Sequence, residues 1–355
     1  MKTLVIMPPV SLTSESLFAT SFLKILTENN EVYAVFPKGL GKLNLNVNKI
    51  SMKILLGPII SPLVDLPLIR FNSFLRRIDF SANLFYSHLH LGLDLDYIIY
   101  PPGIFRNDRI PPYYGIKKIY FKSIYPFIKK LAKSKVNLCS SIYVKNIMKN
   151  NIGFDCDVVY PPVIPPENYE TREKQNIVVG IGKFIPSKHW EEFIEIAKKV
   201  RQKNPTIKFK IIGGLNNAPA SLKYYKGLKD IAGNDVELLT DVNEEEKWRI
   251  FAESKLVLHC MRYDNFGLGV AEAMYAGAVP IVYKSSGTWE DTIQEGKYGI
   301  GYKTIEEAKE EIIKIIEDEK TYKEYSEKAK QRATQFSFNS FRENIMKYLN
   351  IYLEK

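Results

Sequence analysis

Short apolar runs alternate with amphipathic stretches along most of the chain. Alternation of a buried strand with a surface helix is typical of a doubly wound parallel sheet. The first series of apolar runs predicts strands at residues 3–7, 31–36, 52–56, 97–100 and 136–139. A second series predicts strands at residues 177–181, 209–213, 236–239, 256–259 and 279–283. The pattern therefore predicts an α/β fold with two such sheets.

The stretch between the two series has the composition of a linker. Residues 160–171 contain four prolines and few apolar side chains. A chain of 355 residues also exceeds what one hydrophobic core usually supports. We therefore expect two Rossmann-like domains, at residues 1–165 and 172–335, followed by an amphipathic helix at residues 338–355.

Residues 264–283 carry the most informative motif. Asp264 and Glu272 stand eight positions apart, and Gly267 lies between them where a helix should begin. A helix start offers unpaired backbone N–H groups and the positive end of a dipole, so it favours phosphate. Gly277 has the position of a residue that ends the helix, and an apolar run follows it. The segment therefore predicts a loop, a helix and a strand that together hold an anion.

A second motif follows the apolar run at residues 177–181. Gly182 begins a turn there, and Lys183 and Lys188 follow it. In a parallel sheet these lysines would lie outside the carboxyl ends of the strands, where open α/β folds bind ligands. Two ammonium groups near a helix start can neutralise a diphosphate. Gly213 ends another predicted strand; it either lets a nucleotide approach the backbone or forms a plain strand-to-helix turn.

The two motifs resemble the retaining glycosyltransferases of family 4. That family has the GT-B fold, in which two Rossmann-like domains with parallel sheets face each other across a cleft. The resemblance is carried, in unbroken register, by Gly182, Lys183, Phe184, Lys188, Asp264, Phe266, Gly267, Glu272, Ala273, Met274 and Gly277. VVYPPV at residues 158–163 and SSGTWED at residues 285–291 are similar to the branch that adds α-1,2-mannose to lipid-linked oligosaccharides. Similarity begins at about residue 135.

The resemblance implies a hexosyltransferase that moves mannose or glucose from a nucleotide diphosphate sugar to a glycan. Relatives retain the anomeric configuration by a front-side route, in which the donor's own phosphate oxygen takes the acceptor proton. They use no metal and no cofactor besides the donor sugar. The resemblance also implies that the helix at residues 338–355 packs back on the N-terminal domain.

The resemblance further implies a role for each matched residue. Glu272 would accept hydrogen bonds from the ribose hydroxyls, and Asp264 would face the hydroxyls of the donor sugar. Asp291 would border the donor pocket. The leaving diphosphate would be bound by Gly182, Lys183, Lys188 and the backbone amides of Phe266, Gly267 and Leu268.

The chain departs from the family pattern at three places. Lys183 stands where Arg is usual, and Asp264 stands where Glu is usual. The charge is kept at both positions, but Lys lacks the bidentate fork of Arg, and Asp is one methylene shorter than Glu. The turn at residues 8–16 lacks the paired glycines of many relatives. No residue matches their acceptor-side histidine.

The positive charge lies in the N-terminal part of the chain. Residues 1–160 hold 20 Lys and Arg against 10 Asp and Glu, a net charge of +10, whereas residues 161–355 hold 30 of each. The segment 117–135 mixes lysines with aromatic side chains and contains no acid. Such a segment suits an anionic membrane surface, or it is a solvated basic helix. Nucleic acid is not expected as a partner, because no binding motif accompanies the charge.

The remaining features point to the cytoplasm. Cys139, Cys156 and Cys260 are odd in number and unclustered, which argues against a disulfide framework and a zinc site. No apolar run reaches the length of a membrane-spanning helix, and no signal peptide is expected. We therefore expect a protein that lies peripherally on the cytoplasmic face of a membrane.

Two other functions compete with glycosyl transfer. A nucleotide-sugar epimerase on the same fold would need additional acids and bases in the cleft. A non-catalytic protein that binds a glycan or a nucleotide would explain the substitutions at Lys183 and Asp264 as lost activity. The paired lysines together with the spacing of Asp264 and Glu272 favour transfer.

Overall fold

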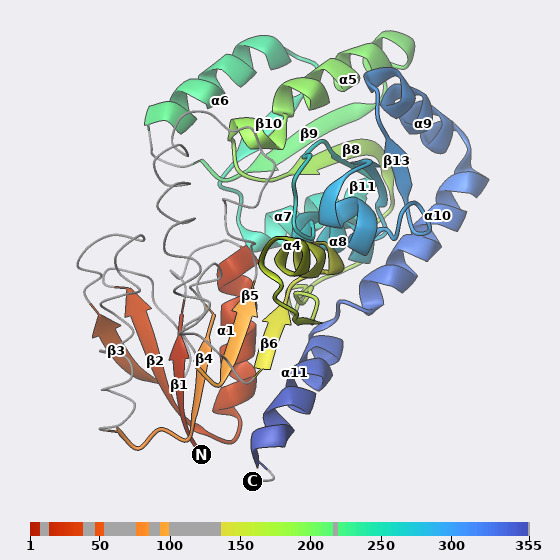
Figure 1. The fold of residues 1–355 in the computed structure, drawn as a ribbon. Helices are drawn as coiled ribbons and strands as arrows, with labels where there is room; N and C mark the ends of the chain where they lie inside the picture. Colours follow the sequence, from red (N-terminus) through yellow and green to blue (C-terminus); the bar gives the residue numbers. More distant parts are fainter. Residues whose placement is uncertain are drawn as a thin grey trace. The chain divides into compact units, whose positions relative to one another are not determined.

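The computed structural model describes residues 1–7, 14–37, 47–52, 76–84, 93–98, 136–215 and 219–353 (Figure 1). The chain divides into two compact units. Unit 1 consists of Met1–Pro162 and Phe338–Lys355, and unit 2 consists of Val163–Ser337. The C-terminal segment therefore belongs to the same unit as the N-terminus.

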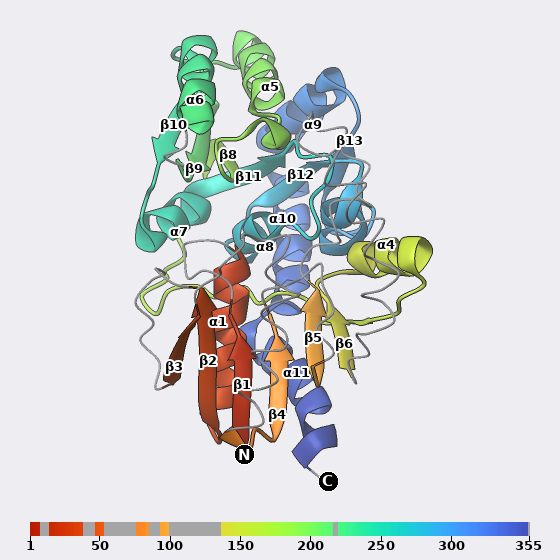
Figure 2. The same cartoon turned by 60° about the vertical axis from the view of Figure 1, so that its left-hand side comes forward.

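Unit 1 is built on a parallel sheet of seven strands in the order β3-β2-β1-β4-β5-β6-β7 (Figure 2). The order reverses direction between β1 and β4, so the sheet is doubly wound. The strands are β1 (Lys2–Ile6), β2 (Glu31–Pro37), β3 (Asn48–Met52), β4 (Phe80–Asn83), β5 (Leu95–Ile98), β6 (Val136–Cys139) and β7 (Asp157–Val158).

The first and the last helix of the chain share the core of unit 1. Helix α1 (Ser14–Thr27) and helix α11 (Phe338–Leu353) lie side by side against the sheet (Figures 1 and 2). The ring of Phe18 stacks on Tyr97 of β5 at 3.8 Å and meets the edge of Phe341 at 5.3 Å. An ion pair of Arg342 with Glu28 adds to this packing. Helix α4 (Ile142–Ile152), the third helix within the described residues of unit 1, connects β6 to β7.

Most of the predicted strands of unit 1 are confirmed. Of the strand predicted at residues 52–56, only Met52 is described, as the last residue of β3; residues 53–56 lie outside the described residues. Strands β4 and β7 were not predicted because they are short. The basic segment 117–135 and most of the turn at residues 8–16 lie outside the described residues.

The expectation that the cysteines are unpaired is wrong for two of them. Cys139 and Cys156 form a disulfide, with 5.9 Å between their Cα atoms. They are 17 positions apart, but β6 and β7 pair in parallel, so the chain passes through α4 and returns beside its starting point. Cys260 is free and buried.

Unit 2 is built on a second parallel sheet, of six strands in the order β10-β9-β8-β11-β12-β13. The strands are β8 (Gln175–Ile181), β9 (Lys208–Gly213), β10 (Glu237–Thr240), β11 (Ser254–His259), β12 (Val279–Tyr283) and β13 (Ile300–Tyr302). All six residues of β11 are buried, as expected for a central strand covered on both faces. The five strands predicted for this part of the chain are confirmed, and β13 is the one that was not predicted.

Helices cover both faces of this sheet (Figures 1 and 2). They are the short 3-10 turn η2 (Pro186–Lys188), α5 (Trp190–Lys203), α6 (Pro219–Ala232), α7 (Glu244–Glu253), α8 (Leu268–Tyr275), the π turn η3 (Thr288–Thr292), α9 (Ile305–Glu317) and α10 (Glu319–Thr334). The π turn η3 contains the last four residues of the segment 285–291. Gly277 follows α8 with φ 86°, the left-handed conformation expected of a residue that ends a helix.

Candidate active site

The two sequence motifs meet at the switch point of the unit 2 sheet. Strands β8 and β11 are neighbours, and the strand order runs outward from them in opposite directions. The Gly182 to Lys188 segment follows the carboxyl end of β8, and the loop that leads to Asp264 follows the carboxyl end of β11. Ligands of open α/β sheets bind at such a point, because the diverging connections leave a crevice there.

Lys188, Asp264 and His259 form one buried cluster at this point. The ammonium Nζ of Lys188 lies 3.4 Å from Oδ2 of Asp264, and both side chains are 18% exposed. Nε2 of His259, at the end of β11, lies 3.0 Å from the same oxygen. Burial raises the pKa of Asp264, but Lys188 and His259 outweigh it and hold that pKa well below its usual range. Asp264 is therefore a carboxylate at any pH near neutral.

The carboxylate of Asp264 also binds the start of helix α8. Its Oδ1 accepts from the backbone N–H of Gly267 at 3.2 Å and of Phe266 at 3.5 Å. Two of the three amides expected to bind a diphosphate thus hold Asp264 in this structure, and the third is that of Leu268. The ring of Phe266 is buried and packs edge-on against Phe336 at 4.9 Å.

Two glycines make the close approaches of this site possible. Gly182 has φ 152°, and a Cβ added there would lie 2.8 Å from Cε of Lys188. Gly267 has φ 82°, and an added Cβ would lie 2.5 Å from Oγ1 of Thr288. A side chain at either position would displace Lys188 or the start of α8.

Lys183 and Gly213 take part in the same edge of the sheet. The side chain of Lys183 is exposed, while its backbone oxygen accepts from the indole N–H of Trp190 at 2.9 Å. Gly213 ends β9 and lies against the ring of Phe184, which follows Lys183. The structure therefore brings these two residues to the strand ends that also carry Lys188.

Glu272 lies one turn inside α8 and is 5% exposed. Its Oε1 accepts from Nζ of Lys247, on helix α7, at 3.1 Å. Burial raises the pKa of Glu272, and Lys247 lowers it only in part, so the pKa stays above its usual value. Asp264 and Glu272 therefore belong to the same segment but have different charged partners.

Asp291 is placed differently from the other predicted residues. It lies in η3 and is completely buried, with 0% exposure. Its backbone oxygen accepts from the guanidinium of Arg332 on α10 at 2.6 Å. The segment around it still reaches the site, because the N–H of Gly287 donates to the backbone oxygen of Asp264 at 2.8 Å.

Three residues of this region were missed by the sequence analysis. His259 could have been found, because it ends a predicted strand at the edge where ligands bind. Lys247 gave no signal, because a lysine on an acidic helix is usually solvated. Lys174 gave no sequence signal either. Its ammonium donates to the backbone oxygens of Phe251, Ser254 and Ala276 at 3.1, 2.9 and 2.6 Å. It thereby joins α7, β11 and the end of α8.

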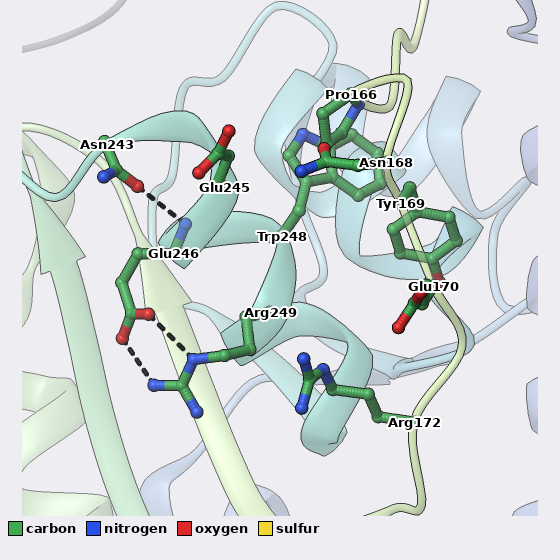
Figure 3. A pocket seen from close by; sticks show the side chains of 10 residues that line it. All are labelled: Pro166, Asn168, Tyr169, Glu170, Arg172, Asn243, Glu245, Glu246, Trp248 and Arg249. Atoms are coloured by element: carbon green, nitrogen blue, oxygen red, sulfur yellow. Dashed lines mark hydrogen bonds and ion pairs between the residues drawn. The ribbon is translucent and has the colours of Figure 1, made fainter.

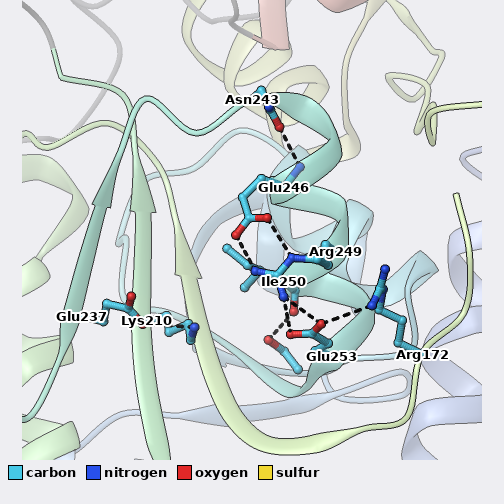
Figure 4. A network of polar contacts seen from close by, with 9 residues as sticks. Arg172, Lys210, Glu237, Asn243, Glu246, Arg249, Ile250 and Glu253 are labelled. Carbon is cyan, nitrogen blue, oxygen red and sulfur yellow. Dashed lines mark hydrogen bonds and ion pairs between the residues drawn. The ribbon is translucent and has the colours of Figure 1, made fainter. Parts of the chain in front are cut away.

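A separate hollow of about 320 Å³ lies between the linker and helix α7 (Figure 3). It contains none of the predicted site residues. Its lining is mostly charged and polar: Pro166, Asn168, Tyr169, Glu170, Arg172, Asn243, Glu245, Glu246, Trp248 and Arg249. The charges of its arginines are compensated, because Arg249 binds Glu246 and Glu253, and Arg172 lies 3.7 Å from Glu253 (Figure 4).

Across the described part of the chain, no group of three or more His, Cys, Asp or Glu side chains could hold a metal ion. The described helices likewise include none that is long and apolar enough to cross a membrane.

The sequence of unit 2 matches a known family. Residues 166–332 match the family model described as glycosyl transferases group 1. They form a glycosyltransferase group 1 domain. That domain holds Lys188, Asp264 and Glu272, together with every other residue predicted for the site.

Curated relatives extend the similarity at low identity. The chain is 24% identical to a GDP-Man:Man(3)GlcNAc(2)-PP-Dol alpha-1,2-mannosyltransferase of Dictyostelium discoideum, over 67% of this chain and 50% of that protein. It is 28% identical to a trehalose synthase of Pyrococcus horikoshii, over 47% of this chain and 41% of that protein. The chain thus spans about half the length of the curated relatives it matches.

Solved structures confirm the predicted fold. The HepE protein of Anabaena, solved in complex with UDP and glucose, has a TM-score of 0.77 at 16% identity, with 99% of both chains covered. The sucrose-phosphate synthase of Thermosynechococcus elongatus has a TM-score of 0.77 at 11% identity, with 100% of both chains covered. The chain therefore has the GT-B fold, an α/β architecture with two Rossmann-like parallel sheets.

Proposed function

We propose that the protein is a retaining glycosyltransferase of family 4 that transfers a hexose, mannose or glucose, from a nucleotide diphosphate sugar to a glycan. The observation that carries this proposal is the meeting of Lys188 and Asp264, 3.4 Å apart, at the switch point of the unit 2 sheet. The match of residues 166–332 to glycosyl transferases group 1 supports it.

In the proposed reaction, Lys183 and Lys188 stabilise the leaving group. The bond between the anomeric carbon and the diphosphate oxygen breaks, so negative charge grows on the nucleoside diphosphate. Fixed positive charges aimed at that position lower the barrier. The acceptor hydroxyl oxygen then bonds to the same face of the anomeric carbon, and its proton passes to the departing phosphate oxygen. No nucleophile from the protein takes part.

The two acids bind different parts of the donor. Glu272 accepts hydrogen bonds from the two ribose hydroxyls, and Asp264 accepts from hydroxyls of the transferred sugar. This division follows from position, because Glu272 lies within α8 whereas Asp264 precedes it and lies beside Lys188. Asp291 acts only through the segment that contacts Asp264, since its own side chain is buried.

We propose that the acceptor is lipid-linked and that the enzyme acts in protein glycosylation at the cytoplasmic face of a membrane. The names of the mannosyltransferase relatives support a dolichol-linked acceptor. The net charge of +10 in residues 1–160, 20 basic against 10 acidic residues, supports an anionic surface as the partner.

The transfer is tested with a panel of GDP-, UDP-, ADP- and dTDP-hexoses, with and without EDTA. We expect one donor to release its nucleoside diphosphate, with the sugar found on an acceptor or free in solution, and we expect EDTA to leave the rate unchanged. Epimerised donor would assign the protein to the epimerases, and binding without turnover would make it a non-catalytic protein. Loss of transfer in EDTA that magnesium or manganese restores would contradict the lysine-based mechanism.

The membrane partner is tested with liposomes that contain anionic lipid. We expect the protein to sediment with them at low salt, and less so at physiological salt, where charges are screened within about 8 to 10 Å. Replacing Lys129, Lys130 and Lys133 with Gln should reduce sedimentation without changing transfer to a water-soluble acceptor. Failure of the wild-type protein to sediment at low salt would remove the membrane from the proposal.

A further inference from the structure

We infer that Lys247 is a positioning residue for nucleotide binding: it holds the Glu272 carboxylate in the geometry and charge state that accept two ribose hydroxyls. The inference rests on the proposed function, because it takes Glu272 as the ribose-binding acid. It adds a residue from helix α7, an element that carries neither of the two sequence motifs.

Lys247 makes two ion pairs from a nearly buried position. Its Nζ lies 3.1 Å from Oε1 of Glu272 and 2.7 Å from Oε2 of Glu244, one turn earlier on α7. The side chains of Lys247 and Glu272 are 11% and 7% exposed, whereas that of Glu244 is 54% exposed. The ion pair with Glu272 is therefore the one shielded from water, and removal of the lysine would affect Glu272 more than Glu244.

The rotation of α7 that aims Lys247 at Glu272 is fixed by its neighbours on the helix. Trp248 is buried, and its ring meets Tyr169 of the linker at 5.3 Å and Tyr275 of α8 at 5.8 Å. Tyr275 lies one turn after Glu272 on α8, so the aromatic contact sets the two helices against each other close to the ion pair. Figure 3 shows Trp248 directed toward the linker.

A polar network on the exposed side of α7 reinforces this orientation. Arg249 donates to Glu246 and to Glu253, one turn away on either side, and Arg172, directly after the linker, lies 3.7 Å from Glu253 (Figure 4). The N-terminus of the helix is capped by Asn243, whose side chain accepts from the N–H of Glu246 at 2.8 Å. Lys247 therefore projects from a helix that is held at its start and along its length.

The electrostatics of Glu272 make it dependent on this lysine. Burial raises its pKa, Lys247 lowers it, and Glu244 raises it. Among the described residues, Lys247 and Glu244 are the charged groups that act on this carboxylate. Burial lowers the pKa of Lys247, but Glu272 and Glu244 outweigh it and leave that pKa raised, so the lysine stays charged. Removing the lysine would leave Glu272 buried and facing only the negative charge of Glu244.

Protonation of Glu272 would change what it can bind. A carboxylate accepts hydrogen bonds on both oxygens, which suits the two adjacent hydroxyls of a ribose. A carboxylic acid has one oxygen that carries a proton and prefers to donate. Without Lys247, nucleotide binding should therefore weaken as the pH falls, because the pKa of Glu272 moves further up toward the working pH.

The test measures the dissociation constant of a bare nucleoside diphosphate by calorimetry, from about pH 6 to about pH 8, a range above the ordinary pKa of a glutamic acid. The probe is whichever of GDP, UDP, ADP and dTDP gives the largest thermal shift with the wild-type protein. For Lys247→Met we expect the affinity for this nucleotide to be about tenfold weaker at about pH 6 than at about pH 8, because one pKa unit corresponds to a tenfold change in an equilibrium constant. Lys247→Arg, which keeps the charge, should restore the wild-type profile.

A matched control is available in Lys255. Its side chain is also 11% exposed, and its Nζ lies 2.9 Å from Glu319 on α10, an acid that has no part in the proposed site. Lys255→Met removes a lysine of the same exposure and an ion pair of similar length, so the nucleotide affinity of this variant should match that of the wild type at each pH. In a Glu272→Gln background, Lys247→Met should add no pH dependence, because the titrating carboxyl is gone.

The outcomes separate the inference from the function on which it rests. If the wild-type protein binds none of the four nucleotides, the proposed function fails. If it binds one of them and Lys247→Met has the wild-type pH profile, the inference fails while the function stands. A loss in Lys247→Met that is equal at every pH and is shared by Lys255→Met would make Lys247 a purely structural residue and also overturn the inference.

Discussion

Asp264 and Glu272 are buried acids of one short segment, yet their surroundings shift their pKa values in opposite directions. The pKa of Asp264 is lowered, because Lys188, His259 and two backbone amides act on a single carboxylate. The pKa of Glu272 is raised, because burial is offset only by Lys247, which also pairs with Glu244. Burial acts on both acids, so the number of nearby donors decides the outcome.

The difference follows from where each acid lies relative to helix α8. Asp264 precedes the helix, where backbone N–H groups have no partner within the helix and the dipole favours a negative charge. Glu272 lies inside the helix, where the N–H groups are already bonded along the backbone. Asp264 thus has donors from its own segment in addition to Lys188 and His259, whereas the charge of Glu272 depends on one side chain from another helix.

The largest effect is expected from removing the lysine beside Asp264. Lys188→Ala should lower the transfer rate by a factor on the order of 100 or more, because a charge that stabilises the developing diphosphate is lost. Steady-state kinetics measure the rate, and circular dichroism checks the fold. Lys255→Ala is the control for losing a part-buried lysine elsewhere in unit 2. Wild-type turnover in Lys188→Ala would show that the Lys188 and Asp264 cluster is structural.

The second prediction separates the roles of the two acids. Asp264→Asn should lower turnover roughly 10- to 100-fold and leave binding of the bare nucleoside diphosphate nearly unchanged, because that ligand lacks the sugar. Glu272→Gln should weaken binding of the same ligand by about tenfold, as expected for losing a charged acceptor. Calorimetry with the bare nucleotide measures both variants. Equal losses of affinity would refute the division of roles.

A smaller effect is expected from the histidine behind Asp264. Burial lowers the pKa of His259, so at neutral pH its imidazole is uncharged, and its Nε2 lies within hydrogen-bond distance of Oδ2 of Asp264, at 3.0 Å. His259→Leu should lower turnover by about tenfold, the value of one hydrogen bond to a charged group, without changing nucleotide affinity. His259→Gln, which offers an amide donor, should recover part of the loss. A similar loss of rate in both variants would mean that the shape of the ring matters and its hydrogen bond does not.

The smallest effect concerns stability, where the two acids should have opposite pH dependence. A lowered pKa means that Asp264 stabilises the fold above its unfolded value of about 3.9, and that this contribution is lost as the pH falls through the folded value. A raised pKa means that Glu272 costs stability above its unfolded value of about 4.3, and that this cost disappears as the pH falls.

Urea unfolding of the two variants across acidic and neutral pH measures this contrast. Asp264→Asn should lose about 1 kcal/mol or more relative to the wild type at neutral pH, and less in acid. For Glu272→Gln the difference from the wild type should shift in its favour as the pH rises from acid to neutral. Parallel pH profiles for the two variants would mean that the two carboxylates share one environment.

Much of the fold could be predicted because its signals are local. Each apolar run of unit 2 contains enough buried residues to mark a strand by itself, and Gly277 marks the end of α8 through a conformation that favours glycine. The strands that were missed, such as β4 and β7, are short. The disulfide of Cys139 with Cys156 was also missed, because it depends on the pairing of β6 with β7.

The sequence alone predicted the charges of the two motifs and which strand ends carry them. Lys188 and Asp264 each follow an apolar run, and parallel strands bring their carboxyl ends to one edge, so the meeting of the two residues could be expected from 76 positions apart. Only the tertiary structure decided how those charges are balanced. His259, Lys247 and Lys174 act through contacts between elements, and the direction of a side chain across such a contact depends on the packing and rotation of both elements.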